Sequence, residues 1–187
     1  MKYSALTGAI AAVVIAGSAF AQTTPSGQLS YDLSAEVGSV CGAYNSSGTE
    51  IDVDFGELAN TATTSTVEES AGSASYACNS PNGFTRTFSS ANGGYLFRSG
   101  TNGGQQNQIA YEMSHGGGSG LSMDWTQLTS AASSDLSGSG FLAGQTGGVD
   151  FRVYGVRSTN SNANGASHTT VFAGDYSDVV TITLTAK

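Results

Sequence analysis

Apolar residues recur at every second position in several short segments of this chain, and this alternation constrains its fold more than any other feature. In VTITLTA, residues 180–186, the apolar side chains fall on one face and the threonines on the other. A period of two is typical of a half-buried β-strand, and β-branched residues suit a pleated surface. The pattern predicts strands here and also at 50–55, 73–78, 84–88, 94–98, 108–113 and 149–156.

Helical signals are almost absent from the rest of the chain. No window after the first 21 residues combines an apolar stripe of helical period with capping residues. The short predicted strands are separated by turns rich in glycine and asparagine, such as SPNG at 80–83 and SANGG at 90–94. This spacing is typical of a β-sandwich. We therefore expect an all-β fold.

The first 21 residues have the features of a secretory signal peptide. Lys2 is followed by an apolar run at 9–15 and then by the small-residue site Ala19-Phe20-Ala21. The continuous apolar run is too short to span a bilayer. We expect cleavage after Ala21, which leaves residues 22–187, enough for one domain.

The charge of the chain makes two classes of partner unfavourable. Loss of Lys2 with the leader leaves five basic and fourteen acidic residues, a net charge of about −9. Such a chain repels the phosphates of nucleic acids and anionic membranes. Eight tyrosines and eight phenylalanines argue against a disordered acidic chain.

Cys41 and Cys78 are the two cysteines of the chain. In an exported protein their default state is a disulfide, which would stabilise the fold by about 4 kcal/mol in the chain-entropy model. A zinc site or a catalytic thiol is the alternative. Two isolated cysteines without a C-x-x-C spacing argue only weakly for metal.

Two polar stretches interrupt the strand pattern. Residues 115–148 are rich in glycine and serine, and residues 158–174 are rich in asparagine. Their composition is that of flexible linkers, so we expect long surface loops in both places. Trp125 and Leu128 are expected to dock part of the first stretch on the domain.

No motif in the chain predicts catalysis or metal binding. No G-x-S-x-G elbow marks a nucleophile, and His115 and His168 lie among glycines and polar residues, where we expect them to be solvated. Asp52 and Asp54 share a strand face, where charges that discourage wrong edge pairing are commoner than calcium ligands. The triplet 54–56, DFG, lacks the other kinase signatures and is read as a strand end followed by a turn. We expect no enzymatic activity, metal or cofactor.

A further alternating segment follows the predicted leader. Its apolar face consists of Leu29, Tyr31, Leu33, Ala35 and Val37. No tight hairpin loop ties this segment to a following strand, and the predicted strand at 180–186 ends one residue before the end of the sequence. A spare strand at one end and a missing strand at the other is what head-to-tail polymerisation requires.

The order of several motifs resembles that of a known family. GQLSYDLSAEVGSVC (27–41), VDFGEL (53–58), SASYAC (73–78), IAYEM (109–113), FRVYGV (151–156) and GDYSDVVTITLTA (174–186) together resemble the major pilins of the archaic chaperone–usher pathway, the spore coat protein U-like family. The most specific part is G-x-Y-x-D-x-V-x-x-T, with Gly174, Tyr176, Asp178, Val180 and Thr183. The 115–148 stretch looks longer than the corresponding loop of a typical member.

The resemblance implies an incomplete immunoglobulin-like β-sandwich, residues 39–187, that is completed by a donor strand from a neighbouring subunit. It implies that the extension at 22–38 donates Leu29, Tyr31, Leu33, Ala35 and Val37, and that a groove beside Val180, Ile182 and Leu184 accepts them. The implied partners are other copies of this chain or related pilins, a periplasmic chaperone and an outer-membrane usher. The implied product is an extracellular pilus that serves surface attachment and biofilm formation.

One alternative stays open from the residues alone. The chain could be a self-sufficient secreted β-sandwich that binds a surface glycan. It would then have to pair residues 29–37 with its own last strand.

Overall fold

The computed structural model describes residues 30–45, 48–58, 65–104, 106–154 and 171–187. The chain divides into two units, residues 1–37 and 38–187, and every strand of the described part lies in the second unit. The predicted leader (1–21), Leu29 and His168 fall outside the described residues.

The second unit consists of two antiparallel sheets. The larger has seven strands, in the order β1 (Cys41–Tyr44), β2 (Thr66–Cys78), β8 (Gln145–Tyr154), β5 (Gln108–His115), β4 (Tyr95–Arg98) and β9 (Tyr176–Ser177), with β6 (Met123–Thr126) also paired to β5. The smaller has three strands, in the order β10 (Val180–Ala186), β3 (Phe84–Ser90) and β7 (Ala132–Leu136). In the described part of the chain the single helix is α1 (Gly140–Ala143). The prediction of an all-β fold is confirmed.

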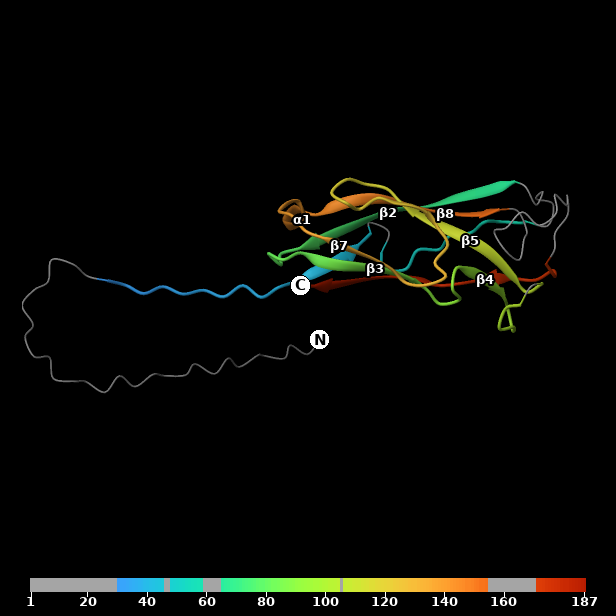
Figure 1. Ribbon diagram of the computed structural model, residues 1–187, viewed down its shortest axis with the longest axis horizontal. Coiled ribbons are helices and arrows are strands. Elements are labelled where there is room, and N and C mark those ends of the chain that lie inside the picture. The colour runs from blue at the N-terminus through green and yellow to red at the C-terminus, as the bar shows by residue number, and fades with distance from the viewer. Residues whose placement is uncertain (1–29, 46–47, 59–64, 105, 155–170) are drawn as a thin grey trace, which may run out of the picture. The chain divides into compact units, whose positions relative to one another are not determined.

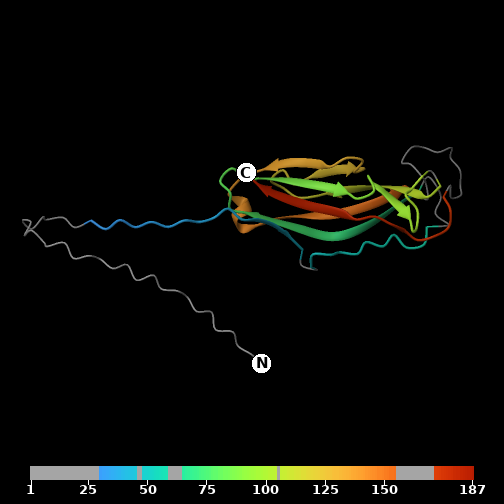
Figure 2. The same cartoon turned by 90° about the horizontal axis from the view of Figure 1, so that it is seen from below.

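The two sheets form layers that share one core. Figures 1 and 2 show β2, β5 and β8 in one layer and β3 with β10 in the other. Figure 1 also shows α1 and the end of β10 at one end of the sandwich and β4 at the other.

The core is built from the inward faces of alternating strands. β3 turns Phe84, Arg86 and Phe88 inward, and Thr85 and Thr87 between them point outward. Each fully buried apolar side chain of this kind contributes about 1.5–3 kcal/mol relative to exposure. The alternation FTRTF therefore holds the smaller sheet on the larger one.

The helix α1 closes one end of the core. Its Phe141 is buried and packs edge-on against Phe84, with 5.0 Å between ring centroids. This edge-to-face geometry is favourable for aromatic pairs. Phe141 thereby fixes the end of the 115–148 stretch against β3.

His115 is buried, so the prediction that it is a solvated loop residue is wrong. It ends β5 with 2% of its surface exposed. Its Nδ1 donates to the Gly116 carbonyl at 2.6 Å, and its Nε2 therefore accepts from the Tyr76 hydroxyl at 2.8 Å. A Cβ at Gly147 would lie 2.4 Å from the His115 ring, which explains the glycine there. The adjacent glycines pack against the histidine and do not mark an open loop.

The 115–148 stretch is not one long surface loop, so that prediction is wrong in part. It holds β6, β7, α1 and the beginning of β8. The expected docking of Trp125 and Leu128 is confirmed: Leu128 is buried, and the Arg152 guanidinium lies 4.3 Å from the centroid of the Trp125 ring. The serine-rich strand β7, ASSDL, carries too few apolar residues to be recognised by alternation.

The predicted strand at 50–55 is wrong as well, because the structure assigns these residues to no strand. The alternation of apolar and polar residues still matches their burial, because Val53 and Phe55 are half-buried while Asp52 and Asp54 are exposed. A strand also needs a hydrogen-bonded neighbour, and none is assigned to 50–55 within the described residues.

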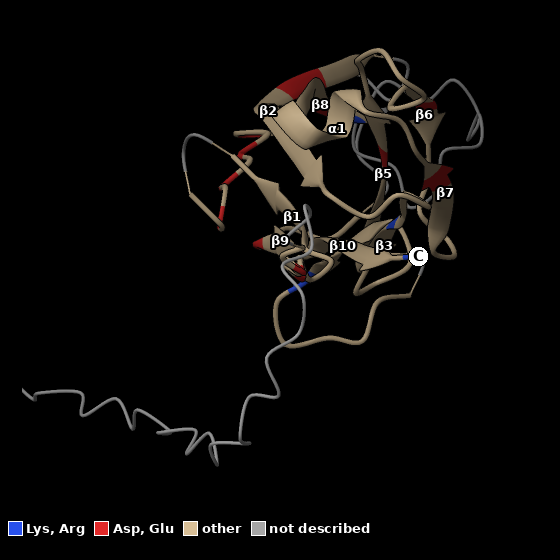
Figure 3. Cartoon of the chain, turned by 90° about the vertical axis from the view of Figure 1, so that its left-hand side faces the viewer, with Lys and Arg blue, Asp and Glu red and all other residues tan. Residues whose placement is uncertain are grey.

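Most charged residues of the chain are acidic, fourteen against six basic ones. Figure 3 shows acidic positions on β2 and β7 and few basic ones. Arg152 pairs with Glu112 at 2.7 Å, and Lys187 pairs with Asp135 at 2.6 Å. No helix in the described ranges is long and apolar enough to cross a membrane.

Candidate docking groove

β10 is the edge strand from which the candidate site is built. It pairs with β3 along its whole length, and no strand of the described chain pairs with its other edge. Val180, Ile182 and Leu184 are half-buried, whereas Thr181 and Thr183 between them are exposed. The free edge of β10 thus carries an apolar face that its own fold covers only partly.

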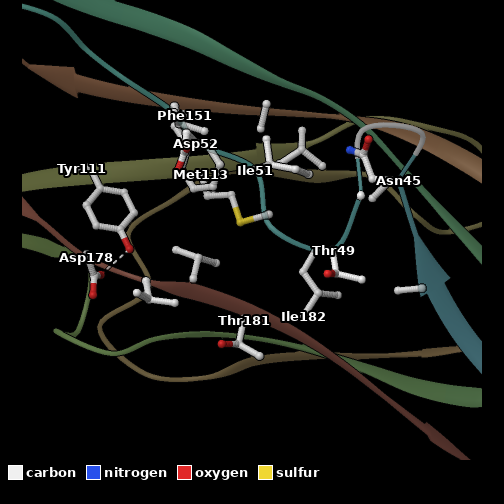
Figure 4. A pocket seen from close by; sticks show the side chains of 18 of the residues that line it. Asn45, Thr49, Ile51, Asp52, Tyr111, Met113, Phe151, Asp178, Thr181 and Ile182 are labelled. Atoms are coloured by element: carbon white, nitrogen blue, oxygen red, sulfur yellow. Dashed lines mark hydrogen bonds between the residues drawn. The ribbon is translucent and has the colours of Figure 1, made fainter.

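A hollow of about 560 Å³ lies beside this edge, and we call it the docking groove. One wall is the first half of β10, and the facing wall is the segment 48–55 (Figure 4). The floor comes from inward side chains of the larger sheet, among them Ala74, Met113, Val149 and Phe151. The groove is a gap in the layer of the smaller sheet, and it is lined by core residues.

The predicted acceptor residues lie at different places along the groove. Val180 and Ile182 line it, whereas Leu184 packs against the core beyond its lined part. The segment 48–55, which forms the opposite wall, was not predicted as part of the site. The alternation of 50–55 was the signal that could have indicated it, because half of its side chains needed a core to face.

One end of the groove is held by a hydrogen-bond cluster around Asp178. Its carboxylate accepts from the Ser90 hydroxyl at 2.5 Å, the Asn92 backbone N–H at 3.0 Å and the Tyr111 hydroxyl at 2.6 Å. Figure 4 shows the bond between Tyr111 and Asp178. Burial above all, and then the hydrogen bond to Asp178, raise the pKa of the Tyr111 phenol, so it stays a donor at physiological pH. The cluster ties the start of β10 to β3 and β5.

The other end of the sandwich holds the disulfide. Cys41 and Cys78 lie opposite each other in the β1–β2 register, and their sulfur atoms are bonded. The disulfide fixes β1 to the larger sheet. β1 lies next to β10, so it also fixes one boundary of the groove.

The alternating N-terminal segment forms no strand in its described part, residues 30–37. Tyr31, Leu33 and Val37 have 79%, 95% and 84% of their surface exposed, and Ala35 is exposed as well. Isolated apolar residues on a protein surface are common, but an alternating series of them is the pattern of a β-strand that has one face to bury. The glycan-binding alternative would need this segment paired with β10.

The root of this segment is anchored by Asn79. The Asn79 side chain accepts from the Val40 N–H at 2.6 Å and donates to the Gly38 carbonyl at 2.9 Å. The Asn79 backbone N–H donates to the Val40 carbonyl at 3.1 Å. The three bonds fix the backbone of residues 38–40 to the turn between β2 and β3.

Within the ranges that the structure describes, no group of three or more histidine, cysteine, aspartate or glutamate side chains could hold a metal ion. The docking groove is apolar over most of its lining. Such a lining suits the burial of apolar side chains from an extended segment.

No protein-family model matches the chain, and no curated protein matches it either. Among solved structures, the chain is similar to one described as "Chaperone-tip adhesin complex is vital for synergistic activation of CFA/I fimbriae biogenesis". The identity is 10% and the TM-score is 0.42, over 79% of this chain and 41% of that one. The chain thus spans less than half of that protein, and a likeness this distant carries no argument about function.

Proposed function

We propose that this chain is a structural subunit of an extracellular pilus and that it polymerises head to tail by donor-strand exchange. Residues 29–37 of one copy would occupy the docking groove of the next copy and pair with the free edge of β10. The observation that carries the proposal is the open groove itself, floored by core side chains and flanked by two backbone segments that are not paired to each other.

The N-terminal segment fits this groove in pattern and in chemistry. Its apolar residues recur at every second position, as do Val180 and Ile182, and its polar residues would face solvent. Burial of Tyr31, Leu33 and Val37, all exposed in the single chain, would contribute about 1.5–3 kcal/mol each. The same segment would also cover Ile51, which is 42% exposed at the rim.

The geometry of the two ends favours one direction of pairing. The donor root at 38–40 lies where β10 ends, because Asn79 holds the root and the neighbouring Ser80 donates to the carbonyl of Lys187 at 2.5 Å. The docking groove extends to Asp178, at the beginning of β10. When copies stack end to end, the donor enters there, with Val37 near the opening and Leu29 deepest. The donor then runs antiparallel to β10, which is the slightly more stable arrangement.

Such a contact is heterologous and does not close on itself, so it yields a fibre. The resemblance to archaic chaperone–usher pilins supports the further parts of the proposal. A periplasmic chaperone would cover the groove before assembly, and an outer-membrane usher would export the subunits. The pilus would serve surface attachment and biofilm formation. The proposal assigns the chain no catalytic activity and no cofactor.

The test compares two charge substitutions at neighbouring positions. Leu33→Asp places a carboxylate on the apolar face of the donor, where burial of an unpaired charge costs several kcal/mol. Ser34→Asp places the same charge on the face that points to solvent, and it is the matched control. We expect the wild type and Ser34→Asp to form thin fibres and gel ladders that collapse on boiling. Leu33→Asp should give only short oligomers or monomers.

Normal fibres from Leu33→Asp would contradict the assignment of the donor face. A chain that lacks residues 22–38 and still forms ladders would exclude donor-strand exchange. A wild-type protein that stays monomeric and folded under all assembly conditions would instead favour the self-sufficient sandwich.

A further inference from the structure

The exposed large hydrophobic residues of the described chain are confined to few places. Three lie in the N-terminal segment, three line the docking groove, and three lie at the two ends of the sandwich; none lies on the outer face of either sheet within the described residues. They are, in that order, Tyr31, Leu33, Val37; Tyr44, Ile51, Val179; and Val40, Leu142, Phe172. The first two groups belong to the proposed donor-strand contact, and the third group has no role in it.

One end of the sandwich, the root end, consists of residues 38–42, 79–83 and 137–144. Val40 follows the donor segment here, and Leu142 of α1 is 66% exposed. The three stretches contain no charged side chain. The chain end at Lys187 lies beside them, hydrogen-bonded to Ser80 and Gly83, and its ammonium is paired with Asp135 at 2.6 Å. In a subunit with a net charge near −9, this end carries few charges, and a second copy can approach it with little like-charge repulsion.

The opposite end carries a second hollow of about 420 Å³, which we call the end hollow. Its apolar lining includes Leu58, Ile109 and Phe172, and Phe172 is 57% exposed under the guanidinium of Arg98. The end hollow shares Phe55 and Leu96 with the docking groove, so the two adjoin each other. Carboxylates of 54, 57 and 175 also line it. This end would repel another acidic surface but can accept an uncharged one.

We propose that the root end of one copy packs on the end hollow of the next copy and forms a second contact beside the donor strand. This inference rests on the proposed function. Val40 lies three residues after Val37, about 10 Å farther along an extended chain. When Val37 sits at the opening of the docking groove, Val40 therefore reaches the adjoining end hollow. Leu142 on the same end then meets the exposed Phe172.

The contact would stiffen the fibre. A donor strand alone joins two sandwiches only at the step from Val37 to the anchored root at Gly38, and the copies can bend at that step. An apolar contact next to this joint fixes the angle between neighbouring copies. The anchoring of 38–40 by Asn79 holds the root in the orientation that the contact needs.

The experiment measures the bending stiffness of fibres from Leu142→Ser, Phe172→Ser and the double variant. Asp124→Ser, at an exposed position of β6 on the flank, is the control. All variants should form heat-sensitive ladders like the wild type. In electron micrographs, the persistence length should fall at least twofold in both single variants, and the double variant should fall no further because both changes remove one contact. Asp124→Ser should match the wild type.

Unchanged persistence length in both single variants, or additive losses in the double variant, would overturn the contact. If a serine variant does not polymerise, a chain with both Leu142→Cys and Phe172→Cys replaces it. Its fibres should become resistant to boiling until a reductant is added, and fibres that dissociate on boiling without reductant would refute the contact. Failure of the proposed function looks different, because the wild type itself would then form no fibres.

Discussion

Replacement of Asp178 by alanine tests how the groove is held open in a sandwich with a free edge strand. The substitution removes three hydrogen bonds to one carboxylate, from Ser90, Asn92 and Tyr111. Hydrogen bonds to a charged group contribute about 1.5–3 kcal/mol each. Because Asp178 is half-buried, we take the lower end of this range and expect a loss of about 4.5 kcal/mol. That is a large part of the stability of a typical domain.

Tyr111→Phe separates the parts of this loss. It removes one donor and leaves the carboxylate with two, so we expect a loss of about 1.5 kcal/mol. In Asp178→Ala the buried Tyr111 hydroxyl has lost its acceptor, and this penalty disappears when Tyr111 is already phenylalanine. The double variant should therefore be about 1–2 kcal/mol more stable than the sum of the single losses predicts.

The assay is urea unfolding of the purified monomer, followed by the fluorescence of Trp125, the single tryptophan. Its ring lies against Arg152 in the folded state, so its emission should report unfolding. A loss below about 1 kcal/mol for Asp178→Ala would mean that the cluster does not hold β10. Strictly additive losses would refute the argument that Tyr111 depends on Asp178.

Two further predictions concern the polar residues of the core. Burial, aided by Arg86 and opposed by the Gly116 carbonyl and Asp150, lowers the pKa of His115, so the folded state disfavours its protonated form. The contribution of His115 to stability should be fully present above about pH 6.5 and should be lost as the pH falls below that value. In urea midpoints measured from about pH 7 to 5, His115→Gln should therefore weaken the dependence of stability on pH. An unchanged pH dependence in this variant would show that other groups cause it. Arg86→Met removes a buried charge whose Nε and Nη1 have no hydrogen-bond partner among the described residues. We expect it to raise the free energy of unfolding by about 1 kcal/mol, and a loss of more than 2 kcal/mol in the same assay would show that its cation–π contacts outweigh the cost of burial.

The strands with one buried and one exposed face were predictable from the sequence. FTRTF at 84–88 and VTITLTA at 180–186 became β3 and β10, and they pair so that Phe88 lies opposite Ile182 and Thr87 opposite Thr183. Each residue type reports directly which face it occupies. For such segments local alternation and tertiary packing agree, so a single sequence is sufficient.

The strands of the 115–148 stretch were not predictable in this way. β7 is ASSDL, and its register with β3 places Ser133 and Asp135 opposite Thr87 and Thr85. Hydroxyl pairs across the two strands, such as Thr87 with Ser133 at 2.9 Å, help hold it there. Such a strand depends on a partner more than 40 residues away, and nothing in its own composition distinguishes it from a linker. The burial of His115 was not predicted for the same reason, because the hydrogen bond that its Nε2 accepts comes from Tyr76 on another strand.

The segment 50–55 shows how a wrong prediction can still carry information. Alternation reports that one face of a segment is buried, whereas strand assignment also requires a hydrogen-bonded neighbour. In EIDVDF, Val53 and Phe55 are half-buried, so one face does turn toward the core. In the described part of the single chain, however, the segment has no hydrogen-bonded neighbouring strand and is not assigned as a strand. The docking groove lies on its free side, with the equally unpaired edge of β10 on the other side of the gap. One extended segment in that gap would give both edges a partner, which supports the proposal that the missing strand comes from another copy.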